Sequence, residues 1–161
     1  MMDRRTFLKV SAGALMLAAA AALTGCGSTG DNRPKVTIDG VDFICESPAL
    51  ITGGSGYRIQ YKPLFAIQNN SANTVTIRPE DISGVFTDEQ GNRYPLDFTS
   101  RALTVQPKAY AEYRTDFTLE SENTVPAQNS TGAYELRVKY NGRTAVFRSD
   151  GSGKKIVPGV E

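Results

Sequence analysis

Few residues in this chain of 161 could carry out catalysis or bind a metal, because the sequence contains no His. Imidazole is the commonest general base and the commonest zinc or copper ligand, and Ser-His and Cys-His dyads depend on it. The remaining candidates are the thiols of Cys26 and Cys45 and the carboxylates of the acidic residues. No glycine-rich phosphate loop follows an expected strand and opens a helix, so the sequence gives no support for nucleotide binding.

Two acidic pairs are the best candidates for oxygen ligands. Glu80-Asp81 and Asp88-Glu89, with Asn92 nearby, could contribute to a calcium site, but their spacing fits no calcium-binding loop. Acidic residues followed by Gly and Asn are also typical of a hairpin turn, which is the interpretation that we prefer. The sequence therefore predicts no enzyme, no bound metal and no cofactor.

Cys26 stands at the end of an apolar run, residues 10–23, and directly follows the small residues Thr24 and Gly25. A membrane-spanning helix needs about 20 apolar residues, so this shorter run is typical of the apolar region of a cleaved signal peptide. The tetrapeptide Leu23-Thr24-Gly25-Cys26 resembles the lipobox of bacterial lipoproteins. The resemblance implies that a diacylglyceryl group is attached to the thiol of Cys26 and that a peptidase cuts just before it.

The start of the chain carries a second motif, which resembles an export signal. Arg4 and Arg5, followed by Phe7, Leu8 and Lys9, resemble the Tat export signal, whose pathway carries folded cargo. The alternative is an ordinary positive segment, which most secretory signals have. Together the two resemblances imply a lipid-anchored protein on the extracytoplasmic face of the cell membrane, with membrane lipid as a partner.

These motifs divide the chain into four parts. We expect a Tat-type lipoprotein signal peptide over residues 1–25, the lipidated cysteine and a flexible tether over 26–34, one domain over 35–149, and a flexible C-terminal tail over 150–161. The eight residues after Cys26 reach at most about 27 Å, so the domain should sit close to the membrane. Without its signal peptide the chain is nearly neutral, which gives no electrostatic case for nucleic-acid binding.

The domain reads as β-structure throughout. Apolar and polar residues alternate with a period of two, and turn residues separate the runs. We expect strands near residues 36–45, 57–67, 74–78, 84–87, 93–98, 109–119, 134–140 and 143–148, with a bulge or bend at Asp39-Gly40. Asn141-Gly142 predicts a tight hairpin, and Pro63 predicts an edge or a bulge. This pattern favours an all-β fold, an antiparallel β-sandwich of about 7–9 strands, with a small closed barrel as the alternative.

Three strings of residues resemble segments of a known group of domains. The strings 61–71, 75–82 and 88–94 give a hydrophobic strand ending in Asn, a second strand, and an acidic-Gly hairpin ending in an aromatic residue. They are similar to the immunoglobulin-like domains found on bacterial lipoproteins. The resemblance covers roughly residues 36–148 and implies an immunoglobulin-like or telokin-like sandwich, a group whose function is mostly unassigned.

Two further features bear on function. With Cys26 attached to lipid, Cys45 is the only thiol left; it shares a strand face with Val41 and Phe43, and we expect it to be buried. Residues 47–56 read as a loop in which Leu50 and Ile51 stand beside several glycines. We prefer the interpretation that they cap one end of the sandwich, and the alternative is a contact loop for a partner.

The expected function is therefore binding and not catalysis. We expect a membrane-anchored module that binds other envelope proteins or extracellular ligands. An accessory subunit of an exported redox complex is the alternative, because the Tat pathway often carries cofactor-bearing partners. An envelope hydrolase has little support without His.

Overall fold

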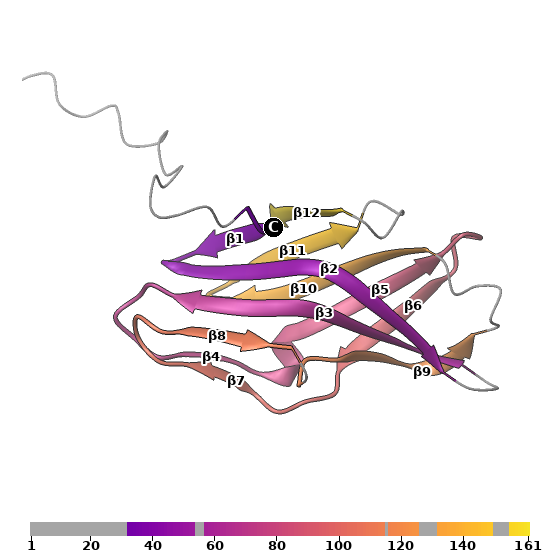
Figure 1. Ribbon diagram of the computed structural model, residues 1–161, viewed down its shortest axis with the longest axis horizontal. Coiled ribbons are helices and arrows are strands. Elements are labelled where there is room, and N and C mark those ends of the chain that lie inside the picture. The colour runs from indigo at the N-terminus through magenta and orange to yellow at the C-terminus, as the bar shows by residue number, and fades with distance from the viewer. Residues whose placement is uncertain (1–31, 54–56, 115, 126–131, 150–154) are drawn as a thin grey trace, which may run out of the picture. The chain divides into compact units, whose positions relative to one another are not determined.

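The computed structural model describes residues 32–53, 57–114, 116–125, 132–149 and 155–161, and in these ranges the chain is all β-structure with no α-helix (Figure 1). The strands are β1 (Lys35–Ile38), β2 (Val41–Gly53), β3 (Tyr57–Asn69), β4 (Val75–Ile77), β5 (Ile82–Asp88), β6 (Arg93–Phe98), β7 (Leu103–Val105), β8 (Tyr110–Tyr113), β9 (Leu119–Val125), β10 (Gly132–Tyr140), β11 (Arg143–Ser149) and β12 (Ile156–Val160). One 3₁₀ turn, η1 (Pro79–Asp81), precedes β5, whose first residue Ile82 is buried in the core.

The strands form one large antiparallel sheet and one small one. The large sheet runs in the order β1-β2-β3-β9-β6-β5-β10-β11-β12, with β8 also paired to β3, and β4 pairs with β7 separately. The large sheet curls until β1 lies against β11 and β12, so that it is nearly closed and barrel-like. The all-β, antiparallel prediction is confirmed. The hydrogen bonding does not divide into the two sheets expected of a sandwich, because β9 and β6 continue the ladder from β3 to β5.

The long strand β3 is the centre of this sheet, and its alternation is confirmed. Every second side chain points into the core and is buried: Ile59, Tyr61, Pro63, Phe65 and Ile67. Pro63 marks an irregularity on both edges, as predicted. On one edge the register with β2 shifts between Glu46 and Pro48, and on the other β8 ends opposite Phe65 while β9 begins opposite Tyr61. Proline has no N–H to donate, so Pro63 removes one ladder bond from one of these two edges.

The predicted single strand over residues 109–119 is wrong. The chain forms β8 and β9 along the same edge of β3, and leaves that edge between them. Phe117 lies in this interruption and is fully buried, with its ring centroid 4.6 Å from that of Phe65 and 4.9 Å from that of Phe98. The gain from burying this aromatic ring offsets the ladder bonds lost opposite Pro63.

Two tight hairpins have paired positive φ angles. Asn141 and Gly142 have φ of 48° and 74°, which confirms the predicted turn between β10 and β11. Asp39 and Gly40 have φ of 49° and 77° and join β1 to β2 in the same way. The predicted bulge or bend at residues 39–40 is therefore a complete two-residue hairpin, because both central residues adopt the left-handed conformation that such turns require.

The predicted flexible tail is wrong for its last residues. Residues 156–160 form β12, which pairs with β11, and the backbones of Thr144 and Glu161 exchange hydrogen bonds of 2.8 and 2.9 Å. In this register the nitrogen of Pro158 points away from β11, so the proline costs the ladder no bond. Ile156 is buried against the core. Residues 150–154 lie outside the described part of the chain.

A closed ring of ion pairs fastens β12 to its neighbours. Glu135 accepts from Arg137 at 2.9 Å and from Arg148 at 2.7 Å, while Glu161 pairs with Arg148 at 2.5 Å and with Arg137. Partial burial of Glu135 opposes its ionisation, but the hydrogen bonds from both arginines outweigh it and lower the pKa of this carboxyl. The ring surrounds Val146, which is fully buried on the outer face of the sheet.

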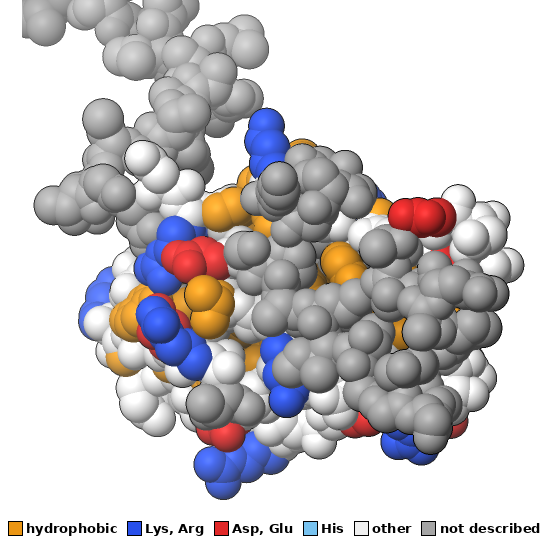
Figure 2. All heavy atoms as spheres, turned by 45° about the vertical axis from the view of Figure 1, so that its right-hand side comes forward, with side chains coloured by type: hydrophobic (Ala, Val, Ile, Leu, Met, Phe, Trp, Pro, Cys, Tyr) orange, Lys and Arg blue, Asp and Glu red, His pale blue; other side chains and the backbone are white. Residues whose placement is uncertain are grey.

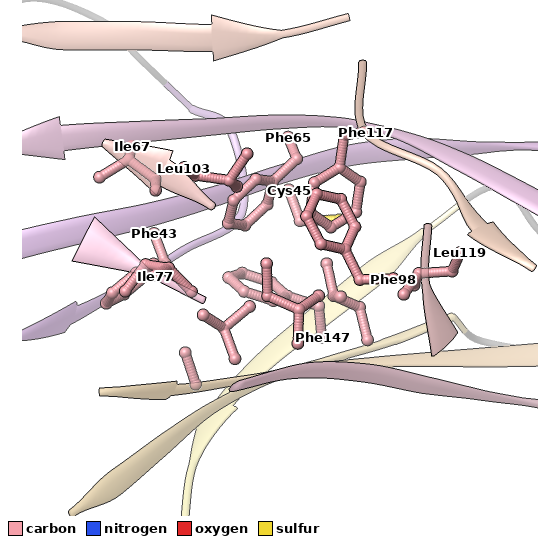
Figure 3. Close-up of a cluster of buried hydrophobic side chains, with 14 of the residues drawn as sticks. Phe43, Cys45, Phe65, Ile67, Ile77, Phe98, Leu103, Phe117, Leu119 and Phe147 are labelled. Carbon is pink, nitrogen blue, oxygen red and sulfur yellow. The ribbon is translucent and has the colours of Figure 1, made fainter. Parts of the chain in front are cut away.

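The core lies between two walls of the curled sheet (Figure 3). Strands β2 and β3 contribute Phe43, Cys45 and Phe65 from one side, and Phe147 of β11 faces them from the other. Aromatic contacts join the walls. Tyr61 stacks on Tyr134 of β10 with centroids 4.9 Å apart, and Phe43 meets Tyr140 edge-on at 5.7 Å. The ribbon of β4 and β7 adds four buried aliphatic side chains: Val75, Ile77, Leu103 and Val105.

Gly84 of β5 tests this packing. A Cβ atom there would lie 2.9 Å from the carbonyl oxygen of Glu135 and 3.0 Å from Cδ1 of Leu119. We expect Gly84→Ala to lower the free energy of unfolding by about 1–3 kcal/mol, because backbone on β10 must shift. The matched control is Gly159→Ala in β12, where the nearest atom is 4.0 Å away and the change should stay within about 0.5 kcal/mol. Equal urea midpoints for the two variants would contradict the described packing.

Candidate functional site

The residues that carry the export and lipidation predictions lie outside the described part of the chain. They are Arg4, Arg5, Phe7, Leu8, Lys9, Leu23, Thr24, Gly25 and Cys26. Their roles therefore remain predictions from the sequence.

The loop predicted over residues 47–56 is wrong for residues 47–53, whose backbone belongs to β2. Leu50 pairs with Tyr61 and Ile51 pairs with Gln60. The strand continues because β3 offers it a partner as far as Arg58, and the extra residue Ser47 is absorbed at the register shift. A contact role for Leu50 and Ile51 stays a prediction, now for strand positions.

Cys45 is a buried thiol, as predicted. Its side chain is fully buried, and its Sγ lies 3.9 Å from the hydroxyl of Tyr61. Burial raises the pKa of Cys45 to about 12, and the hydrogen bond from Tyr61 offsets only part of this effect. The nucleophilic thiolate is therefore almost unpopulated at neutral pH.

Asp88 closes its hairpin, which confirms the turn interpretation for this residue. One carboxylate oxygen accepts from the backbone N–H of Gln90 and Asn92, at 3.0 and 2.8 Å, and the other accepts from the side chains of Asn92 and Tyr94, at 2.9 and 3.1 Å. Desolvation opposes ionisation, but the four hydrogen bonds together lower the pKa of Asp88. Within the described ranges, no cluster of three or more His, Cys, Asp or Glu side chains could hold a metal ion.

A cluster of polar side chains joins segments that are distant in the sequence, and the sequence did not predict it. We call Arg33, Glu46, Tyr110, Glu112 and Arg114 the Arg33 junction. Arg33 belongs to residues 32–34, which precede β1 and which we call the lead. Glu46 belongs to β2, and the other three belong to β8 or to the residue that follows it. The junction therefore ties the first described residues to two strands of the barrel-like sheet.

The geometry of the junction is specific. The guanidinium of Arg33 pairs with Glu46 at 3.1 Å and with Glu112 at 3.4 Å, donates to the hydroxyl of Tyr110 at 2.9 Å, and lies 5.6 Å from the centre of the Tyr110 ring. Tyr110 in turn donates to Glu112 at 2.9 Å, and Arg114 donates to Glu112 at 2.6 Å. Two cations face two anions, so the junction is neutral overall.

A second contact holds the lead in place. The backbone N–H of Cys45 donates to the carbonyl of Pro34 at 3.0 Å, which extends the β1–β2 ladder toward the N-terminus. On the outer face of β2 and β3, Ile44 and Ala66 stand opposite each other and are buried, although their side chains point away from the core. The folded domain therefore includes Arg33 and Pro34, and the prediction that these two residues belong to a flexible tether is wrong.

No motif in the sequence predicts the junction. Arg33 lies 77 residues from Tyr110 and 79 from Glu112 along the chain, and only the pairing of β2, β3 and β8 brings them together. The run of small and polar residues before Arg33 is typical of a tether. The one available signal was the position of Arg33 and Pro34 directly before a strand.

The chemistry of the junction suits fastening and not proton transfer. The pKa of Glu112 is lowered to about 2, first by the hydrogen bond from Arg114 and next by that from Tyr110. A carboxylate that weak is a poor general base at neutral pH. On the face of the molecule in Figure 2, basic and acidic side chains of the described residues are intermingled, in keeping with the near-neutral composition.

Comparisons with protein-family models, curated proteins and solved structures gave no match. Within the described residues, no helix is long and apolar enough to cross a membrane.

The pKa of Glu112 offers a test of the junction. Arg114→Ala should raise this pKa by more than Tyr110→Phe does, because the hydrogen bond from Arg114 is the larger cause of its depression. Since folding lowers the pKa, the carboxylate stabilises the fold above its ordinary value of 4.5, and this contribution is lost as the pH falls through about 2. A carboxyl-carbon NMR titration measures the shift. Equal pKa values in the two variants would contradict the described geometry.

Proposed function

We propose that this protein is a membrane-anchored, extracytoplasmic lipoprotein whose domain binds an envelope protein or an extracellular ligand and catalyses no reaction. The observation that carries the proposal is the sequence Leu23-Thr24-Gly25-Cys26, placed after a short apolar run and only seven residues before Arg33. Lipid on Cys26 would hold the domain at the membrane surface through the short segment 27–31.

Three features support binding over catalysis. The thiol of Cys45 is buried with a raised pKa, and Asp88 is engaged by four hydrogen bonds within its own turn. The Arg33 junction holds its carboxylates in ion pairs. These groups are thus committed to the fold, and the outer surface of the sheet remains for a partner.

We also propose that the domain is a member of the immunoglobulin-like group. The strand that ends in Asn in that group has a counterpart here, since the buried amide of Asn69 donates to the carbonyls of Asn73 at 2.8 Å and of Val105 and Gln106 at 3.1 Å each. The acidic-Gly hairpin has its counterpart in Asp88 and Gly91, the latter with φ of 84°. A flattened barrel with two facing walls differs from a sandwich mainly in whether the ladder continues around one side.

Export through the Tat pathway supports one alternative function. Arg4-Arg5 suits a domain that folds before export, and it equally suits travel with a folded, cofactor-bearing partner. An accessory subunit of an exported redox complex would co-purify with a flavin- or metal-containing enzyme in fixed ratio. A stand-alone binding module would not, so purification in mild detergent separates these two proposals.

The anchor itself has a direct test. We expect the wild-type chain to fractionate with membranes and to carry an acyl-modified Cys26 by mass spectrometry, because the diacylglyceryl group is its attachment. Cys26→Ser should abolish the modification and release the protein, whereas Cys45→Ser, the control at the other cysteine, should leave both properties unchanged. A Cys26→Ser protein that stays in the membrane fraction would refute lipid anchoring.

A further inference from the structure

We infer that the outer face of the wall formed by β2, β3 and β8, centred on the Arg33 junction, is the surface of this domain that lies against its own membrane. The occupant of this face is the lipid bilayer, with Tyr110 at the headgroup level. This inference rests on the proposed lipidation of Cys26 and adds the orientation of the domain to it.

The tether is too short to allow every orientation. Six residues lie between Cys26 and Arg33, and the seven residue-to-residue steps that join them span at most about 25 Å when fully extended. A compact domain of about 130 residues has a radius of gyration of about 14 Å and is roughly 35 Å across. A lipid-bound Cys26 therefore cannot reach Arg33 if the face that carries Arg33 points away from the membrane.

The structure fixes where the tether meets the domain. Arg33 lies over the outer face of β2 and β3, because it contacts Glu46 on one side and Tyr110 and Glu112 of β8 on the other. The bond from the N–H of Cys45 to the carbonyl of Pro34 holds the next residue to β2. The chain cannot swing freely at Arg33, so the short tether begins at this face and nowhere else.

The chemistry of the face fits a membrane interface. Tyr110 is 43 % exposed, a large aromatic side chain with a polar hydroxyl, and side chains of this kind are enriched where a protein meets lipid headgroups. The charges around it cancel in pairs: Arg33 with Glu46, and Arg114 with Glu112. The junction therefore needs no anionic lipid, and we expect it to dock on zwitterionic bilayers with little dependence on salt.

Single tryptophan probes test this orientation, since the natural chain contains no Trp. Tyr110→Trp places the probe at the junction and keeps an aromatic ring beneath Arg33. Val85→Trp is the matched control. Val85 is on the outer face of β5, and β5 is part of the wall on the opposite side of the core. The lipidated proteins are reconstituted in phosphatidylcholine vesicles that contain brominated phosphatidylcholine, which quenches Trp fluorescence at short range.

We expect quenching to be at least about twofold greater for Tyr110→Trp than for Val85→Trp, because only the first probe reaches the headgroup region. Adding Arg33→Ala to Tyr110→Trp should bring its quenching down toward the control, while adding Arg114→Ala should leave it high. Equal quenching of the two probes, or no effect of Arg33→Ala, would overturn the inferred orientation and leave lipid anchoring intact. Failure of the wild-type chain to carry lipid on Cys26 would overturn both the anchor and the orientation.

Discussion

The rest of the structure depends on one long strand, β3. Its inward side chains from Ile59 to Ile67 are buried in the core. β2 pairs with one edge of β3, and β8 and β9 share the other. Pro63 divides the strand in the middle, because it can donate to neither neighbour. At that point β2 shifts register and the chain between β8 and β9 turns inward to bury Phe117.

The pairing along β3 also builds the Arg33 junction. The half of β3 beyond Pro63 pairs with β8, which carries Tyr110 and Glu112 to within reach of Arg33. The other half pairs with β9 and leads the ladder around to β5 and β10. One half of this strand therefore continues the ladder toward β5, and the other half positions the strand that completes the Arg33 junction. Core packing and the contacts of Arg33 both depend on the strand pairing of β3.

The sequence predicted those features whose causes are local. The hairpin at Asn141-Gly142 and the closed turn at Asp88 need only their own residues, because positive φ and short side-chain hydrogen bonds determine them. The inward parity of β3 is local too, since alternation over a long run allows one burial pattern. The features missed depend on distant partners. β12 is held by Arg137 and Arg148, and the Arg33 junction by residues of β2 and β8, so composition alone made both segments look unstructured.

The contacts of Arg33 hold the lead on the sheet and keep the tether short. The most direct measurement is amide hydrogen exchange at Cys45, whose N–H is bonded to the carbonyl of Pro34. In Arg33→Ala this amide should exchange about fivefold faster, because the lead opens locally, while global stability changes little. In Arg114→Ala, which removes a junction residue outside the lead, it should exchange at the wild-type rate. Unchanged exchange at Cys45 in Arg33→Ala would contradict the account.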